Sequence, residues 1–250
     1  MTIIMHILPM PQPPCRRVVL IAVPGAQSLD VTGPLEAFAG ANHELAAPGY
    51  RLVVASPGGG AITTSSGLVF ATVRLATLRA TAKDTVLVAG ADERGVRAAI
   101  ADGGLTAWLA RAAPTVERIG SVCSGAFALA AAGLLAGRRV ATHWMYMDLL
   151  PAFGATPVAE RVVIDRNRIT AGGVTAGIDF GLRVIAEIAG VEAAQTAQLE
   201  LEYDPQPPFA CGHPRSAPAE LVASVRARFA ARMAEREAQL ARLRAAAPAR

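Results

Sequence analysis

Short apolar runs alternate along this chain with longer segments in which apolar residues recur at helical spacing. Apolar runs bounded by turn residues predict strands, and continuous ones are typical of strands covered on both faces of a parallel sheet. Single strands are predicted within 16–25, 50–59, 84–95, 116–122 and 138–144. Strand pairs are predicted within 62–73, around a Ser-Ser-Gly turn, and within 162–173, around Asp-Arg-Asn.

Helical periodicity fills most of the remaining chain. Helices are predicted within 27–41, 94–112, the stretch after residue 123, the stretch ending near Phe153, and 174–203. Thr175 is the expected N-cap of the last of these, and Gly190 is expected to interrupt it. Strands that alternate with helices predict an α/β fold, a flavodoxin-like doubly wound and mostly parallel sheet with helices on both faces.

Ligands of such sheets bind beyond the carboxyl ends of the strands. Asp30, expected just before the first helix, Gly90 and Cys123 each follow a predicted strand end. One crevice is therefore expected to hold all three residues.

The last segment of the chain differs in character. Its first part, DPQPPFACGHPRSAPAE, is rich in proline, and an Ala/Arg/Leu-rich helix follows. Apolar residues of this helix roughly keep helical spacing: Leu221, Val225, Phe229, Met233, Leu240 and Leu243. We expect a flexible tail at 1–16, an α/β domain at 17–203, and a C-terminal helical arm at 204–250 that packs on the body or on a second subunit.

Composition supports one sizeable core. The 250 residues are 52% hydrophobic, yet no run of about 20 apolar residues predicts a membrane span. The first residues, MTIIMHILPMPQPPCRR, lack a basic start and a cleavage site, so they do not resemble a signal peptide. A cytoplasmic protein without membrane contact is expected.

Three widely spaced cysteines, Cys15, Cys123 and Cys211, argue against a disulfide framework and suit a reducing compartment. The four histidines are scattered, and no CxxC or HExxH motif occurs. No metal site and no cofactor are expected.

The formal net charge of +4 raises the question of nucleic-acid binding. Seven arginines and three glutamates of 217–250 carry all of this excess, and the rest of the chain is neutral. A basic terminal helix is most often a solvated face, so no nucleic-acid partner is expected.

Cys123 is the residue with the most specific surroundings. It lies where the run Val116 to Val122 changes into an Ala- and Leu-rich helical stretch, with Ser121 and Gly125 two positions away on either side. Small residues around a strand-to-helix junction are typical of a nucleophile elbow, and the first amides of a helix favour a thiolate. The alternative is a buried structural cysteine.

The motifs SVCSGAFALAAAGLLAGRRVATHW and TAGGVTAGIDF resemble the ThiJ/PfpI (class I glutamine-amidotransferase-like) superfamily. Two branches share them: the sensor domain of AraC-type regulators and the isocyanide hydratases. The resemblance to the hydratases extends over roughly 17–220, through SLDVTGPLEAF, ATHWMYMDLLPAFGATPVAERVVIDRN and LELEYDPQPPFACGHPRSAPAE. Only 47 residues follow Tyr203, too few for the two helix-turn-helix units of such a regulator, which disfavours that branch.

The resemblance implies roles for individual residues. Cys123 matches the family nucleophile and Asp30 the acidic residue that faces it. Ser124 stands where the hydratases usually have Thr, and it keeps the hydroxyl. Gly90 and Ala91 match a Gly-Gly turn whose amides would face the reacting centre.

Ala91 and Asp92 depart from the family pattern. If the second turn position needs a positive φ, Ala91 is strained by about 1 kcal/mol or shifts the turn. Asp92 adds an unusual charge beside it. His143 is expected to line the crevice as a substrate-binding residue, and a structural hydrogen-bonded role is favoured over that of a general base. Asp179 is expected to cap or pack near a helix start.

The implied activity is that of an isocyanide hydratase, a lyase that acts on a small-molecule isocyanide through a thioimidate on Cys123, in a homodimer. Two alternatives stay open. One is another cysteine-dependent activity of the superfamily, of glyoxalase or deglycase type. The other is a redox-sensing or regulatory domain without its DNA-binding part.

Overall fold

The computed structural model describes residues 16–44, 49–101 and 103–246. An eight-stranded sheet with the order β3-β4-β2-β1-β5-β6-β10-β9 forms its centre. The strands are β1 (Arg16–Ile21), β2 (Tyr50–Ser56), β3 (Gly60–Thr63), β4 (Val69–Arg74), β5 (Asp84–Val88), β6 (Arg118–Val122), β9 (Val162–Asp165) and β10 (Arg168–Ala171). The six inner strands are parallel, and the edge strands β3 and β9 pair antiparallel with β4 and β10, as the two predicted turns require. The predicted mostly parallel α/β sheet is confirmed.

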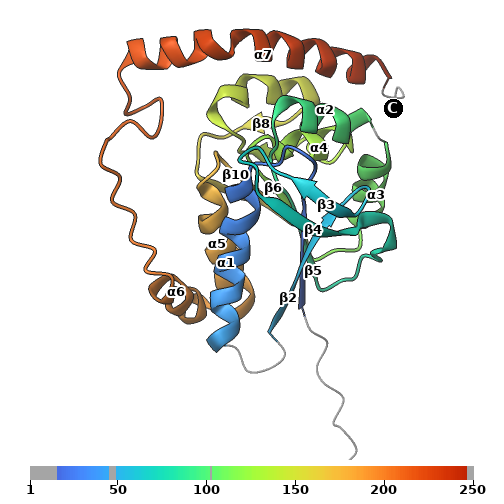
Figure 1. Cartoon of the computed structure of the whole chain (residues 1–250), viewed down its shortest axis with the longest axis vertical. Helices are drawn as coiled ribbons and strands as arrows, with labels where there is room; N and C mark the ends of the chain where they lie inside the picture. The colour runs from blue at the N-terminus through green and yellow to red at the C-terminus, as the bar shows by residue number, and fades with distance from the viewer. Residues whose placement is uncertain (1–15, 45–48, 102, 247–250) are drawn as a thin grey trace, which may run out of the picture.

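Helices cover both faces of this sheet (Figure 1). The helices are α1 (Ser28–Glu44), α2 (Glu93–Ala101), α3 (Gly104–Ala112), α4 (Ala126–Ala131), α5 (Ala176–Ala189), α6 (Val191–Glu200) and α7 (Ala219–Ala246). Along β1, Val18 and Leu20 join the core under α1, α5 and α6, whereas Val19 and Ile21 join the core under α2, α3 and α4. Alternate side chains of one strand point to opposite faces, so a strand covered on both sides must be apolar throughout.

Three short segments are 3₁₀ helices: η1 (Leu75–Thr77), η2 (Cys123–Gly125) and η3 (Trp144–Phe153). The helix expected to end near Phe153 is therefore a 3₁₀ helix, which contains Pro151 and closes at Gly154 with φ of 70°. It lies between the two short strands β7 (Arg139–Val140) and β8 (Thr156–Pro157). The helix expected after Cys123 is shorter than its sequence suggests, because α4 has six residues and begins three positions later.

Thr175 occupies the predicted N-cap position of α5, but its side chain makes no capping hydrogen bond. Its hydroxyl accepts a hydrogen bond from Arg161 at 3.1 Å instead. Gly190 interrupts the helical segment as predicted, between α5 and α6.

The C-terminal arm crosses the molecule in two parts. An extended segment runs outside the body from α6, and α7 lies over the end of the sheet that carries α2, α4 and β8 (Figure 1). Arg226 of α7 stacks over the Trp144 ring at 5.4 Å and lies 3.8 Å from the Asp148 carboxylate. Leu221, part of the predicted apolar stripe, is 43% exposed. The side chains of Met233, Leu240 and Leu243, the tail 1–15 and Cys15 lie outside the described part of the chain.

None of the helices in the described ranges is long and apolar enough to cross a membrane.

Candidate active site

Cys123 follows directly after β6 and is 8% exposed. Its φ of 55° lies in the left-handed region, which costs a residue with a side chain on the order of 1–3 kcal/mol. Two hydrogen bonds hold this conformation: Cys123 N donates to Gly172 O at 2.8 Å, and Thr142 Oγ1 donates to Cys123 O at 2.7 Å. The chain therefore turns sharply at the cysteine, with the geometry expected of an elbow.

Gly125 explains why small residues surround this turn. A Cβ at this position would lie 2.2 Å from Val88 O, inside van der Waals contact. The turn after Cys123 therefore presses against the end of β5, and only glycine fits there. Because η2 is a single 3₁₀ turn and α4 is short, the expected effect of a long helix on the thiol is reduced.

Asp30 lies in the first turn of α1 rather than just before the helix, and it is fully buried. Its Oδ2 accepts a hydrogen bond from Gly90 N at 2.8 Å. Burial raises the pKa of this carboxyl from 3.8 to about 7, although hydrogen bonds from Gly90 and from the Cys123 thiol oppose the rise. Its Oδ1 is buried without a well-formed hydrogen bond within the described chain. A sizeable fraction of Asp30 is therefore protonated near pH 7.

Gly90 is the point at which the candidate residues meet. A Cβ at Gly90 would lie 2.6 Å from Asp30 Oδ2, 2.9 Å from Cys123 Cβ and 2.9 Å from Ser124 N. The ends of β1, β5 and β6 thus bring Asp30, Gly90 and Cys123 together. The three residues predicted to share one crevice therefore lie next to one another.

The amides of the 90–91 turn have partners within the protein, contrary to expectation. Gly90 N points at Asp30, and Ala91 N donates to Ser124 Oγ at 3.1 Å. Ser124 Oγ in turn donates to Ala91 O at 3.1 Å, so this hydroxyl fixes the turn. Sequence patterns do not specify such hydrogen-bond partners, and a role of this turn beside the reacting centre stays a prediction.

Ala91 and Asp92 both fit the local backbone. Ala91 is absent from the residues with positive φ in the described chain, so it carries no left-handed strain. Asp92 precedes α2, and its Oδ1 accepts a hydrogen bond from Gly95 N at 2.8 Å. The Asp92 carboxylate therefore caps the N-terminus of α2.

His143 adjoins the cysteine turn through Thr142. Its Nδ1 accepts a hydrogen bond from Met145 N at 3.4 Å, and its ring contacts those of Trp144 and Tyr146. A Cβ at Gly173 would lie 2.9 Å from His143 Cδ2, so the imidazole lies against the backbone after β10. These contacts fit the expected structural role, and the ring also lines a cavity.

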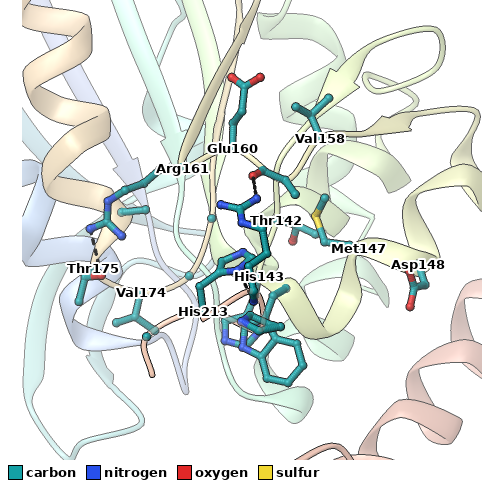
Figure 2. A pocket seen from close by; sticks show the side chains of 18 of the residues that line it. Thr142, His143, Met147, Asp148, Val158, Glu160, Arg161, Val174, Thr175 and His213 are labelled. Carbon is teal, nitrogen blue, oxygen red and sulfur yellow. Dashed lines mark hydrogen bonds between the residues drawn. The ribbon is translucent and has the colours of Figure 1, made fainter. Parts of the chain in front are cut away.

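This cavity has a volume of about 570 Å³ and lies between the body and the C-terminal arm (Figure 2). Thr142 and Gly172, which hold the backbone of Cys123, are among its lining residues, whereas Cys123 is not. The arm contributes His213 and Arg215. Sequence reasoning missed both, because the only signal for them, the segment CGHPRSAP, does not indicate where the arm folds back.

Asp179 takes part in an ion pair near this cavity. Its Oδ2 accepts hydrogen bonds from Arg161 Nε at 2.6 Å and from the Tyr203 hydroxyl at 3.0 Å. These two hydrogen bonds join the start of α5 to the segment before β9 and to the segment that follows α6. The expected role in packing fits, and helix capping is not its main contact.

No group of three or more potential metal ligands occurs within the ranges that the structure covers.

Comparisons with known proteins agree with this arrangement. The model of the DJ-1/PfpI family matches residues 16–187. The crystal structure of a ThiJ/PfpI family protein from Pseudomonas syringae superposes with a TM-score of 0.83 at 33% identity, over 94% of this chain and 98% of that one.

Two curated relatives differ in function. An isonitrile hydratase of Pseudomonas putida is 56% identical over 110 residues, which is 44% of this chain and 48% of that protein. The HTH-type transcriptional regulator GlxA of Rhizobium meliloti is 37% identical over 66% of this chain and 49% of its own length. The chain thus spans about half the length of each relative. On the family match and the full-length structural similarity, the chain belongs to the DJ-1/PfpI family.

Proposed function

We propose that this protein is an isocyanide hydratase, which converts R–N≡C and water into the formamide R–NH–CHO. The observation that carries the proposal is the meeting of two groups at Gly90: a cysteine held at positive φ and a buried carboxyl with a pKa of about 7. Attack on an isocyanide carbon requires a nucleophile and a nearby acid. The similarity to the isonitrile hydratase adds independent support.

The first step forms a covalent intermediate on Cys123. The thiolate sulfur bonds to the terminal carbon of the isocyanide, and the proton of Asp30 passes to that carbon. The product is a thioimidate, R–N=CH–S–Cys123, and Asp30 is left as a carboxylate. Burial favours the protonated form of Asp30 before this step.

The second step releases the formamide. Asp30 carboxylate takes one proton from a water molecule as the water oxygen adds to the thioimidate carbon, and the remaining proton of the added hydroxyl passes to the nitrogen. The carbon–sulfur bond then breaks, which restores the thiolate and leaves R–NH–CHO. Asp30 ends protonated, ready for the next substrate.

Ser124 and the 90–91 turn position these groups. The Ser124 hydroxyl fixes both the amide and the carbonyl of Ala91, and Gly90 N orients the Asp30 carboxyl. Ser124 N lies 2.9 Å from the position of a Cβ at Gly90, and we assign this amide the stabilisation of charge at the reacting carbon. His143 borders the site, and the hydrogen bond that its Nδ1 accepts from Met145 N helps to hold the ring in place.

A direct test is incubation of the full chain with cyclohexyl isocyanide while N-cyclohexylformamide is quantified. The expected result is many turnovers per protein, lost in Cys123→Ala and Cys123→Ser variants that keep the circular dichroism of the parent. Absence of formamide with a thiol that still reacts with a maleimide would contradict the proposal.

The similarity to the GlxA regulator supports a second candidate, a ligand-sensing domain built on the same fold. In that case a small electrophile would bind without being consumed. The same assay separates the candidates, because a sensor forms no formamide and an enzyme forms many equivalents.

A further inference from the structure

The cavity between body and arm is large enough for a small organic ligand. Its volume of about 570 Å³ lies within the usual range of roughly 300–1,000 Å³ for such sites. One wall comes from the segments 142–148, 158–161 and 172–176, and the other from 212–215 and Arg226 of α7 (Figure 2).

The charges around the cavity balance except at Arg215. The other ionised side chains of the wall each have an opposite partner: Arg161 with Asp179 at 2.6 Å, Arg226 with Asp148 at 3.8 Å, and Glu160 with Arg139 at 3.3 Å. Arg215 Nη1 donates to Ala159 O at 2.7 Å, and no carboxylate pairs with Arg215 in the described part of the chain. The guanidinium has five N–H donors in a planar fork, so most of its donor capacity remains for a ligand.

A neighbouring imidazole adds a donor to the same wall. His213 Nδ1 accepts a hydrogen bond from Arg215 N at 3.1 Å, which assigns the proton of the neutral ring to Nε2. Partial burial and the charge of Arg215 lower the pKa of His213, which favours the neutral ring. The arm therefore presents a cation and an N–H group, a combination that matches an anion with oxygen acceptors.

Two residues that line the cavity are hydrogen-bonded to the backbone of Cys123, the candidate nucleophile. Thr142 and Gly172 both line the cavity, and they hold the carbonyl and the amide of Cys123 at 2.7 and 2.8 Å. The wall of the cavity is therefore in direct hydrogen-bond contact with the backbone of the Cys123 turn.

Building on the hydratase function proposed above, we infer that the substrate is an isocyanide whose substituent ends in a carboxylate, and that this carboxylate binds Arg215 in the arm-walled cavity. Arginine and carboxylate form two parallel N–H···O bonds, which fix orientation as well as charge. Because the carboxylate lies away from the reacting carbon, this contact strengthens ground state and transition state alike. Its loss is therefore expected to raise KM and to leave kcat nearly unchanged.

The experiment compares charged and neutral substrates of the same shape. Isocyanoacetate and 3-isocyanopropanoate are assayed beside their methyl esters in the full-length protein and in Arg215→Gln, Arg215→Lys and Arg111→Gln. Arg111 is exposed on α3, which supplies none of the described residues lining the cavity, so Arg111→Gln is the matched loss of one charge.

We expect at least one carboxylate to exceed its ester about 10- to 100-fold in kcat/KM. Arg215→Gln abolishes this ratio through KM, Arg215→Lys keeps part of it, and Arg111→Gln keeps all of it. If esters and cyclohexyl isocyanide are hydrated but no carboxylate is preferred, or if Arg215→Gln keeps the ratio, the inference is overturned while the hydratase function stands.

A binding measurement decides the inference even without turnover. Calorimetry with the full-length Cys123→Ala protein compares the products N-formylglycine and N-formyl-β-alanine with the neutral N-formylglycinamide. The expected result is at least about tenfold tighter binding of one carboxylate, lost in Cys123→Ala/Arg215→Gln. Equal or absent binding of all three compounds overturns the carboxylate site, and absence of formamide from every isocyanide overturns the hydratase function instead.

Discussion

Asp30 and Cys123 face each other across the missing side chain of Gly90: a Cβ there would lie 2.6 Å from the carboxyl of Asp30 and 2.9 Å from Cβ of Cys123. The separation of the two groups is set by the backbone at the end of β5. This relationship explains why the turn after that strand begins with glycine, independently of the conformation that the residue adopts.

Replacement of Gly90 by alanine is expected to displace Asp30, Cys123 or the turn itself. A displacement of about 1 Å typically costs on the order of 100-fold in rate, so kcat/KM for an isocyanide should fall by at least that factor. Steady-state formamide assays check the prediction. Gly58→Ala is the matched control, since a Cβ at Gly58 meets nothing within 4 Å, and this variant should keep full activity.

The buried carboxyl of Asp30 makes stability depend on pH. Because folding raises its pKa from 3.8 to about 7, the folded state binds the proton more tightly than the unfolded state. The free energy of unfolding therefore falls as pH rises from about 4 to 7, by up to about 4 kcal/mol, and the full penalty is present above pH 7.

Asp30→Asn removes this penalty. Urea unfolding should show the variant to be more stable than the parent at pH 8 and similar at pH 4. Asp165→Asn should act in the opposite direction at pH 8, because the Arg139 amide and the charge of Arg138 lower the pKa of Asp165. A variant Asp30→Asn that is less stable than the parent at pH 8 would contradict the assigned environment of this carboxyl.

The proton on Asp30 should also govern catalysis. If the protonated carboxyl supplies the proton to the isocyanide carbon, kcat/KM should decline above pH 7, about tenfold per pH unit. Asp30→Asn should be strongly impaired, and its residual activity should lack this decline. A kcat/KM that is flat from pH 6 to 9 in the parent would exclude Asp30 as the acid.

The sequence pattern predicts the scaffold of the site but not its contacts. General rules for parallel sheets predict that β1 is apolar on both faces. The same rules predict that Asp30, Gly90 and Cys123 lie at strand ends. The partners of the 90–91 amides depend on where Ser124 and Asp30 lie in space, which no local pattern encodes.

The arm illustrates a second limit of sequence analysis. Arg215 reaches Ala159, 56 positions earlier in the chain, through a proline-rich segment without helical or strand periodicity. Neither spacing nor composition indicates such a contact. The cavity wall formed by His213 and Arg215 therefore became visible only in the structure.

The exposed part of the arm predicts a dimer. Every residue from 204 to 212 is exposed on the single chain, and Phe209 is 76% exposed within this segment. An extended segment with an exposed aromatic side chain is expected to pack against a second copy. Sedimentation at micromolar concentration should give twice the chain mass of 25.8 kDa, and Phe209→Ser should shift the equilibrium towards monomer. A purely monomeric parent protein would contradict this prediction.

The most direct test of the account is a rapid acid quench of the full-length protein with cyclohexyl isocyanide, followed by intact and peptide mass spectrometry. The account predicts a transient adduct on Cys123, heavier by the mass of one isocyanide, that forms and decays as the formamide accumulates. Formamide produced at the parental rate by Cys123→Ala, without any adduct in the parent, would contradict covalent catalysis by this cysteine.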